Sequence, residues 1–423
     1  MLNLAEKLRA HDGIAWCSSW SPDSQYVASC GQDRRIRLWR YSDRKLISIP
    51  VEKRTEEPHS RTIRRIVWRG DSKLLAAVSF DSTVSLWYLE PGGAQLRYLT
   101  KLSGQESEVK GVSFSVCGDM FATCSRDKSI WIFDLTDLRI PGITSTVTSL
   151  GDFQAVPSAP EMLIEQESEG EFMMPVSPTH VPDIDCLAVL QGHSQDVKSV
   201  RFSPHDSNLL VSVSYDDSVR VWSSSESTGT SDDWHGSAVL KAAQGGHSNT
   251  VWDVCFNPVS EKSEFITVGA DGCIKVWSRK NPLKNIASSW FLAGGPLNLH
   301  ARNQSSRQPV SPTNSPWTCL VSIQATMSMH ESVPTPPIYS VDWFKDGRFV
   351  ALACGDNTVR MYLRTLSSLV PLCSVKTEYE PNCVSFRQSL DDNIIILSVM
   401  CDDGGLLVYE FDTTDPHQLI HLE

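Results

Sequence analysis

An Asp residue followed six positions later by an aromatic residue recurs seven times along this chain of 423 residues. The pairs are Asp33/Trp39, Asp81/Trp87, Asp127/Phe133, Asp216/Trp222, Asp271/Trp277, Asp356/Tyr362 and Asp403/Tyr409. A spacing that repeats mostly every 46 to 55 residues indicates a repeat architecture. One repeat with a small sheet cannot bury both faces alone, so the copies must pack against each other. We therefore predict an all-β fold, a seven-bladed β-propeller.

The best-preserved copy spans residues 190–222 and reads LQGHSQDVKSVRFSPHDSNLLVSVSYDDSVRVW. Alternating apolar residues between turn residues predict three strands within it. This copy resembles the WD40 repeat. The resemblance implies a buried hydrogen-bonding tetrad, formed by His193, Ser212, Asp216 and Trp222. Removing one member would leave its partners unpaired, which costs roughly 1–3 kcal/mol.

The other copies keep the tetrad to different degrees. Complete tetrads are expected in two further copies, from His11, Ser29, Asp33 and Trp39 and from His247, Thr267, Asp271 and Trp277. The histidine position holds His59 in the second copy, Gln105 in the third, His330 in the sixth, and Tyr379 or Glu380 in the seventh. We expect these four tetrads to be degraded. In the seventh copy Asp402 competes with Asp403 for the turn.

A closed ring of seven copies accounts for residues 1–423 as a single propeller. We predict blade 1 at residues 10–56, blade 2 at 57–103, blade 3 at 104–191, blade 4 at 192–244, blade 5 at 245–327, blade 6 at 328–377 and blade 7 at 378–412. The last copy has only three strands of its own. Resemblance to WD40 propellers implies that residues 1–9 supply its outer strand, and residues 418–422 are the alternative.

Two blades contain insertions, at residues 136–182 in blade 3 and 280–316 in blade 5. Both are rich in Ser, Thr, Pro and Gly, and the first has an acidic run between Glu161 and Glu171. We predict that both are disordered. Each follows the third strand of its blade and precedes the fourth. Because the strands alternate in direction, both insertions leave from one face, and the opposite face, the uncluttered face, is free of them.

Side chains on the uncluttered face come from the residues around each turn Asp and from the start of each first strand. They mix aromatic and basic residues in an acidic protein, which is typical of protein interfaces. The set is Trp16, Arg64, Phe80, Lys110, Arg126, Lys128, Lys198, Tyr215, Trp252 and Tyr339, with Gln32 and Asn382 beside them. We predict a partner-binding face with Arg126 as its foremost residue, and the alternative is an ordinary propeller surface.

Composition narrows the classes of function. The 12 Cys include no C-x-x-C pair, and several lie in apolar runs, which indicates reduced core thiols of a cytosolic or nuclear protein. No apolar run approaches the roughly 18 residues of a membrane helix, and the N-terminus has no secretory signal. The net charge of −12 disfavours nucleic-acid binding over the whole surface. The tetrad histidines belong to separate copies, so no metal or catalytic residues are predicted.

Longer motifs are more specific than the repeat itself. They are ATCSRDKSIWIF (122–133), HSQDVKSVRF followed by SVSYDDSVRVW, DDW (232–234), GGHSNTVWDVCFNP (245–258), and IYSVDW with ACGDNTVRMY (338–362). In this order they resemble the WD40 subunit of the targeting complex in cytosolic iron–sulfur protein assembly. The resemblance covers all seven blades and leaves out both insertions.

This resemblance implies a non-enzymatic scaffold without a cofactor, in the cytoplasm and also the nucleus. It would help deliver 4Fe–4S clusters to cytosolic and nuclear apoproteins. The implied partners are a MIP18-family protein, a HEAT-repeat adaptor, an iron-only hydrogenase-like cluster carrier and client apo iron–sulfur proteins, but neither nucleic acid nor membrane. By match to the SRDKS motif, Arg126 would be the surface Arg of partner recognition. The alternatives are a WD40 scaffold of a ubiquitin ligase or chromatin complex, and an enzyme that uses the central channel.

Overall fold

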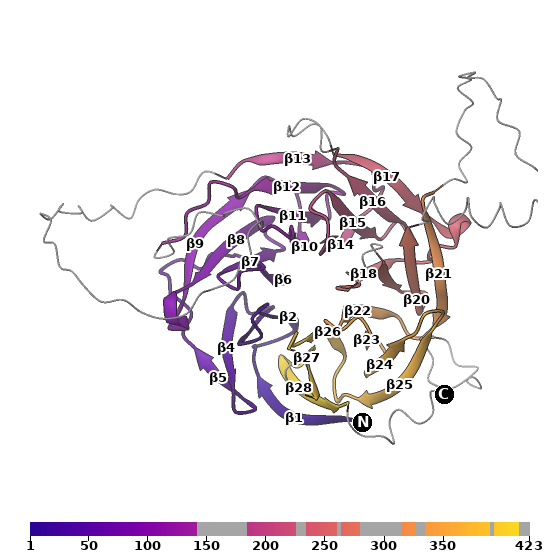
Figure 1. Ribbon diagram of the computed structural model, residues 1–423. Coiled ribbons are helices and arrows are strands. Elements are labelled where there is room, and N and C mark those ends of the chain that lie inside the picture. The colour runs from indigo at the N-terminus through magenta and orange to yellow at the C-terminus, as the bar shows by residue number, and fades with distance from the viewer. Residues whose placement is uncertain are drawn as a thin grey trace, which may run out of the picture.

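The computed structural model describes residues 1–141, 184–225, 234–259, 264–279, 315–325, 335–389 and 393–413. Within these residues the strands form seven four-stranded antiparallel sheets. The sheets stand around a central axis with their first strands innermost (Figure 1). The chain is a seven-bladed β-propeller, which confirms the predicted fold class. The two predicted insertions fall largely on residues 142–183 and 280–314, which lie outside the described residues.

The first four blades follow one another along the chain. Blade 1 consists of β2 (Ala15–Trp20), β3 (Tyr26–Gly31), β4 (Ile36–Ser42) and β5 (Lys45–Ile49). Blade 2 consists of β6 (Ile63–Trp68), β7 (Leu74–Ser79), β8 (Thr83–Leu89) and β9 (Leu96–Ser103). Blade 3 consists of β10 (Val109–Phe114), β11 (Met120–Ser125), β12 (Ile130–Asp134) and β13 (Cys186–Leu190). Blade 4 consists of β14 (Val197–Phe202), β15 (Leu209–Ser214), β16 (Val219–Ser223) and β17 (His235–Leu240).

The remaining blades complete the ring. Blade 5 consists of β18 (Val251–Phe256), β19 (Phe265–Gly269), β20 (Cys273–Arg279) and β21 (Trp317–Gln324). Blade 6 consists of β22 (Ile338–Trp343), β23 (Phe349–Cys354), β24 (Thr358–Arg364) and β25 (Leu369–Lys376). Blade 7 consists of β26 (Pro381–Phe386), β27 (Ile394–Cys401), β28 (Gly405–Asp412) and the N-terminal strand β1 (Leu2–Arg9). Short 3-10 turns lie at Pro91–Gly93 and Ala242–Gln244.

The two ends of the described chain meet in blade 7. Strand β1 pairs antiparallel with β28, from Leu2 opposite Phe411 to Arg9 opposite Gly405. This pairing closes the ring and leaves no open edge between the first and the last blade. Residues 418–422, the alternative for this outer strand, lie outside the described residues.

The turn between the second and third strands has the same backbone form in every blade. The residue after the turn Asp has a positive φ throughout, at Arg34, Ser82, Lys128, Asp217, Gly272, Asn357 and Gly404. In the seventh blade this register makes Asp403 the turn residue, since its carboxylate accepts a hydrogen bond from the backbone N–H of Gly405 at 2.9 Å. Asp402 instead accepts one from the Asn382 side chain at 2.8 Å. The Asp side chain thus stabilises its own turn.

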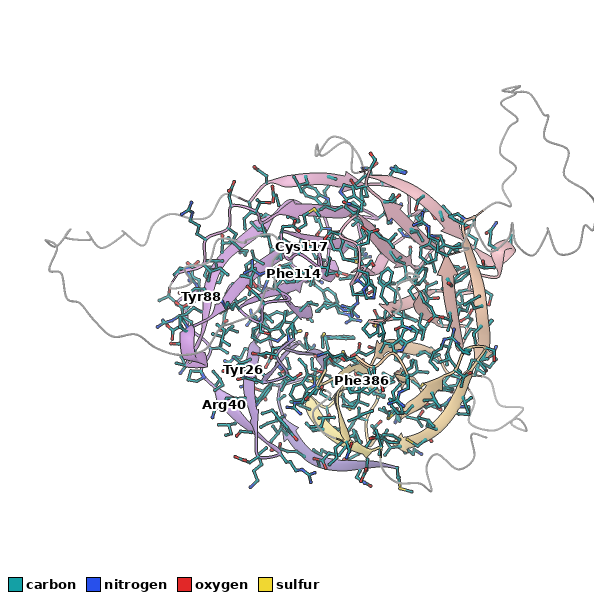
Figure 2. All side chains as sticks on the ribbon, in the orientation of Figure 1. Tyr26, Arg40, Tyr88, Phe114, Cys117 and Phe386 are labelled. Carbon is teal, nitrogen blue, oxygen red and sulfur yellow. The ribbon has the colours of Figure 1, made fainter. Side chains whose placement is uncertain are left out.

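The core lies between neighbouring blades. Strands β3, β7, β15 and β23 are buried along their whole length, which explains why they consist of apolar residues and serines without a charged residue. Phe114 and Phe386 lie closer to the axis than Tyr88 and Arg40, and side chains fill the space between the blades (Figure 2). One cluster joins Trp20 of blade 1, Trp68 of blade 2 and Met400 of blade 7. In the described part of the chain no helix is long and apolar enough to cross a membrane.

Candidate partner-binding face

Each innermost strand begins with a β-bulge on the uncluttered face. The pairing with the second strand skips the second residue of every first strand. A bulge leaves that residue unpaired and redirects its side chain. These seven residues, which we call the bulge ring, are Trp16, Arg64, Lys110, Lys198, Trp252, Tyr339 and Asn382. The sequence placed them on one face, and the bulge explains how all seven reach it.

The residue before each turn Asp lies next to the bulge ring. Its backbone N–H donates to the carbonyl just before the first strand, as in Phe80 to Thr62 at 3.0 Å and Tyr215 to Asp196 at 2.9 Å. Arg126 does the same with Glu108 at 2.9 Å. The two groups of predicted residues therefore form one surface.

Aromatic and cationic side chains of the bulge ring contact one another and the neighbouring Tyr215. The Lys198 Nζ lies 4.9 Å from the ring centres of both Tyr215 and Trp252. Trp252 meets Tyr339 edge to face at 5.8 Å. On the other side of the ring the Arg64 guanidinium lies 4.8 Å from the centre of the Trp16 ring. Each cation–π contact of this kind contributes roughly 0.5–2 kcal/mol, so the aromatic rings are held in place before a partner arrives.

Two polar groups on this surface, the Lys198 ammonium group and the Trp252 indole N–H, are incompletely stabilised by their surroundings. Burial and the nearby charge of Lys110 together lower the pKa of Lys198 to about 8. The Trp252 indole N–H is buried without a hydrogen-bond partner among the described residues. An unpaired buried donor is uncommon in native proteins. Both groups would gain from an acceptor supplied by another molecule.

Glu108 and Asp196 are part of this face, although the sequence analysis did not include them. Glu108 accepts a hydrogen bond from Arg61 at 3.0 Å and lies 3.6 Å from both Lys110 and Arg126. Asp196 accepts one from Lys110 at 2.9 Å. The sequence pattern could have identified both carboxylates, because each stands two positions before a Lys of the bulge ring, in Glu-Val-Lys and Asp-Val-Lys. These carboxylates orient the basic side chains.

Arg126 remains available to another molecule. Its side chain is 58% exposed, and its single close carboxylate among the described residues is Glu108. Lys128 is exposed in the next turn position, with a φ of 77°. Tyr215 is 51% exposed, although large aromatic side chains are usually covered. Phe80 is half-buried beneath Arg61 and Lys110, whose charged groups lie 5.8 and 5.9 Å from its ring centre.

Below this face, the tetrad residues of blades 4 and 5 form closed hydrogen-bond networks. His193 contacts Asp216 at 3.1 Å and Ser212 at 2.8 Å, and the Trp222 indole donates to Ser212 at 2.8 Å. In blade 5 the matching distances are 2.9 Å for His247–Asp271, 2.8 Å for His247–Thr267 and 2.9 Å for Trp277–Thr267. Burial alone would raise the pKa of Asp216. The hydrogen bond and electrostatic attraction of His193, with hydrogen bonds from Ser218 and the Ser194 backbone, together hold the pKa well below its ordinary value.

Blade 1 differs from the tetrad predicted for it. His11 contacts Asp33 at 2.8 Å and Ser29 at 2.7 Å, yet within the described residues the Trp39 indole donates no hydrogen bond to Ser29. In the other six blades a bulge lies at this aromatic residue in the pairing with the outer strand. The pairing of β4 with β5 is regular. Trp39 therefore lacks the bulge that accompanies this position elsewhere.

Blade 2 has a complete network, where a degraded one was expected. His59 contacts Asp81 at 3.3 Å and Ser85 at 2.7 Å, and Trp87 donates to Ser85 at 2.8 Å. Ala77 occupies the usual hydroxyl position, and Ser85 lies directly opposite it on the next strand. In blade 3, by contrast, buried polar atoms of Gln105 and Thr123 lack partners among the described residues. His330 lies outside the described residues.

A buried ion pair crosses the central channel. Arg65 of blade 2 donates to Asp253 of blade 5 at 3.0 Å and to Ser199 of blade 4 at 2.9 Å. Ser199 also donates to Asp253 at 2.7 Å, and Ser340 of blade 6 does so at 3.3 Å. Burial would raise the pKa of Asp253, but the charges of Arg65 and Arg201, together with hydrogen bonds from Ser199 and Arg65, lower it below its ordinary value. Four blades are thus linked just beneath the bulge ring, and sequence reasoning missed this link.

The family model of the WD domain, G-beta repeat, matches residues 3–40, 51–88, 96–134, 184–223, 239–278 and 322–362. These matches cover more than half of the chain. Strands β26 to β28 of blade 7 lie outside them. Blade 7 is therefore the copy that departs furthest from the repeat pattern.

The chain is similar to fungal proteins that share one name. It is 38% identical over 139 residues to the probable cytosolic iron-sulfur protein assembly protein 1 of Candida glabrata, which covers 31% of this chain and 41% of that protein. The protein of the same name from Mycosarcoma maydis is 33% identical over 172 residues, covering 32% and 38%. This chain spans about two fifths of the length of each of these two relatives. That of Botryotinia fuckeliana is 27% identical over 410 residues, covering 82% and 78%. These names confirm the resemblance drawn from the blade motifs.

Proposed function

The chain belongs to the WD40-repeat family, and from this membership we propose that it is a non-enzymatic scaffold of cytosolic iron–sulfur protein assembly. The observation that carries the proposal is the bulge ring. It brings four aromatic or basic contacts and an exposed Arg126 to the face opposite the insertion points. Aromatic and Arg anchors dominate the energetics of protein interfaces. The names of the relatives supply the process.

On this proposal the uncluttered face recruits other assembly proteins. Its partners are a MIP18-family protein, a HEAT-repeat adaptor and an iron-only hydrogenase-like cluster carrier, together with client apo iron–sulfur proteins. The scaffold works in the cytosol and also serves nuclear clients. The 4Fe–4S cluster is cargo that passes between partners. In the described part of the chain no group of three or more His, Cys, Asp and Glu residues is placed to hold a metal ion.

A second observation supports a role without catalysis. The channel end away from the bulge ring is a cavity of about 350 Å³ that contains Cys255 and Asp342. Their Sγ and Oδ1 atoms lie 3.6 Å apart. Burial raises the pKa of Asp342 to about 6 and also raises the pKa of the Cys255 thiol, which the Asp342 charge raises further. A thiol shifted in this direction stays protonated and is a poor nucleophile.

Charge reversal at Arg126 tests the proposal. Arg126→Glu places a second carboxylate beside Glu108, so capture of a purified MIP18-family protein should weaken by about tenfold or more. The Arg126 side chain is 58% exposed, so the melting temperature should stay near that of the parent. Lys345→Glu is the matched control, because it makes the same charge change in the β22–β23 loop on the other face.

Equal capture by Arg126→Glu and the parent would reject this face as the site of recruitment. Affinity purification from cells followed by mass spectrometry tests the process. Recovery of ubiquitin-ligase or chromatin-complex subunits in place of iron–sulfur assembly proteins would contradict the proposal.

A further inference from the structure

The outer edge of blade 1 is incomplete. Strand β5 pairs with β4 only from Leu38 to Ser42, whereas in blade 2 the outer strand β9 pairs with β8 from its first residue, Thr83. After Ile49 the chain leaves blade 1 and crosses to blade 2, where Val51 bridges Leu96. Ile36 and Arg37 at the start of β4 therefore have no described strand on their outer side. Such an open edge can pair with an added extended chain.

A cavity of about 730 Å³ lies at this open edge, between blades 1 and 2. Its apolar lining comes from both blades and includes Ile36, Trp39, Val51, Ile63 and Trp87. All of these except Val51 are buried in the sheets. Trp39 is the indole that forms no tetrad hydrogen bond. The cavity thus offers an apolar surface beside unpaired backbone.

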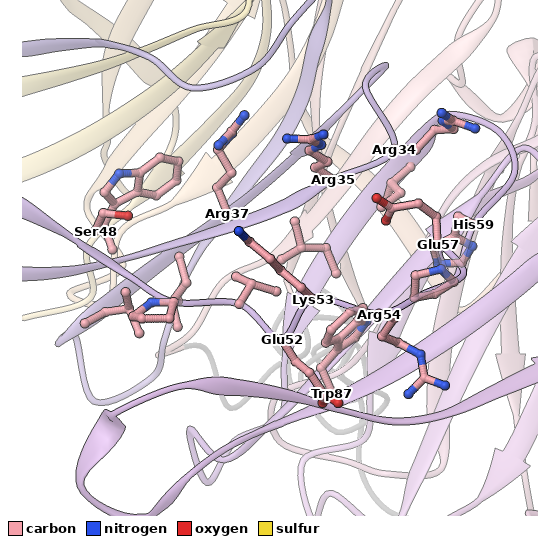
Figure 3. Close-up of a pocket in the computed structure, with 18 of the residues that line it drawn as sticks. Arg34, Arg35, Arg37, Ser48, Glu52, Lys53, Arg54, Glu57, His59 and Trp87 are labelled. Atoms are coloured by element: carbon pink, nitrogen blue, oxygen red, sulfur yellow. The ribbon is translucent and has the colours of Figure 1, made fainter.

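Basic side chains surround the cavity. Arg34, Arg35 and Arg37 follow one another along one side, and Lys53 and Arg54 come from the crossing segment (Figure 3). The acidic residues that line it are Glu52 and Glu57. The Glu52 carboxylate already accepts a hydrogen bond from the Tyr98 backbone N–H at 2.9 Å, and among the described residues it does not pair with the basic side chains of the cavity. The lining is therefore positive in a chain whose net charge is −12.

Several of these cations have no carboxylate of their own. No carboxylate of the described residues lies within ion-pair distance of the exposed side chains of Arg34, Arg35 and Lys53. Arg37 lies 3.7 Å from Asp33, a carboxylate that His11 also contacts, and its buried Nε has no partner in the described part of the chain. Unpaired cations around a cavity attract an anionic ligand.

We propose that this cavity binds an acidic peptide segment of a partner protein in extended conformation, with an apolar side chain of the segment against Trp39 and Trp87. The three features complement such a segment: the β4 edge can pair with its backbone, the apolar lining accepts one of its side chains, and the basic side chains meet its carboxylates. Nucleic acid would use the cations but neither the sheet edge nor the lining. No residue of the bulge ring lines the cavity, and the proposal does not depend on the proposed function.

Fluorescence anisotropy with the full chain tests this site. The probe is a fluorescein-labelled synthetic peptide in which two Ile residues are flanked by Glu and Asp, and its counterpart carries Gln and Asn in their place. We expect saturable binding of the acidic peptide only. The double variant Arg35→Glu/Lys53→Glu should weaken its Kd by about tenfold or more, because both exposed cations become repulsive.

The matched control is Lys45→Glu/Lys376→Glu, which changes the net charge equally at exposed positions outside the cavity. It should bind the acidic peptide with a Kd within about twofold of the parent, because it leaves the cavity unchanged. Equal weakening by both double variants would overturn the proposal, as would equal binding of the uncharged peptide. Displacement of the peptide by single-stranded DNA at equal concentration would also overturn it, in favour of a polyanion site.

Discussion

The ion pair across the channel gives the strongest stability prediction. The side chains of Arg65 and Asp253 are 6% and 1% exposed, so neither charge has solvent as an alternative partner. In Asp253→Ala the Arg65 guanidinium loses its acceptor at 3.0 Å, and the hydroxyls of Ser199 and Ser340 lose theirs. Removing one partner of a buried pair leaves an uncompensated charge, which costs about 3–5 kcal/mol. We expect the free energy of unfolding to fall by this amount.

Urea unfolding followed by Trp fluorescence measures this loss, and a double variant separates its causes. Arg65→Met/Asp253→Leu removes both charges and keeps an apolar filling of similar volume, so it should lie within about 1–2 kcal/mol of the parent or above it. If Asp253→Ala loses less than about 1 kcal/mol, or if the double variant is as unstable as Asp253→Ala, the pair does not stabilise the ring as a unit.

Two further predictions concern the tetrads. Asp216→Ala should lower the free energy of unfolding by about 1–3 kcal/mol, because His193 and the backbone N–H of Ser194 lose their acceptor. The control Asp217→Asn, in the neighbouring turn position, should stay within about 0.5 kcal/mol of the parent. Equal losses of stability in the two variants, measured by thermal melting, would contradict a special role for Asp216. Burial would raise the pKa of Asp271, but the hydrogen bond and electrostatic attraction of His247, together with the backbone N–H groups of Ser248 and Cys273, lower it to about 2 from the ordinary 3.8. The contribution of Asp271 to stability is therefore present above pH 3.8 and is lost as the pH falls towards 2. Unfolding measured from pH 5 down to pH 2 should show this loss in the parent and a smaller one in Asp271→Asn, and identical pH profiles would refute it.

The turns and the uncluttered face could be predicted from the sequence because their causes are local. In six of the seven turns the Asp carboxylate accepts a hydrogen bond from the backbone N–H two residues later, and in blade 6 Asp356 accepts one from the Thr358 hydroxyl. One residue type at one spacing therefore specifies the turn. The alternation of strands then decides which loops share a face. For this reason the sequence could assign Arg64, Lys198 and Trp252 to the same face of the propeller before their contacts were known.

What could not be predicted depends on residues far apart in the chain. Arg65 and Asp253 are 188 positions apart and meet only because the ring brings blades 2 and 5 to one channel. In blade 2 the hydroxyl of the tetrad comes from Ser85, because Ala77 stands at the position that carries it in the other complete tetrads. Ser85 lies opposite Ala77 in the sheet but is eight positions away in sequence. The early end of β5 is likewise a property of strand pairing, so the cavity beside Trp39 has no sequence motif.

Amide hydrogen exchange of the chain with and without a purified MIP18-family protein tests most directly whether the uncluttered face binds partners. The proposal predicts slower exchange on binding at residues 105–110 and 194–199, which carry Glu108, Lys110, Asp196 and Lys198. Slower exchange confined to the loops of the other face, at residues 69–73 and 203–208, would contradict it.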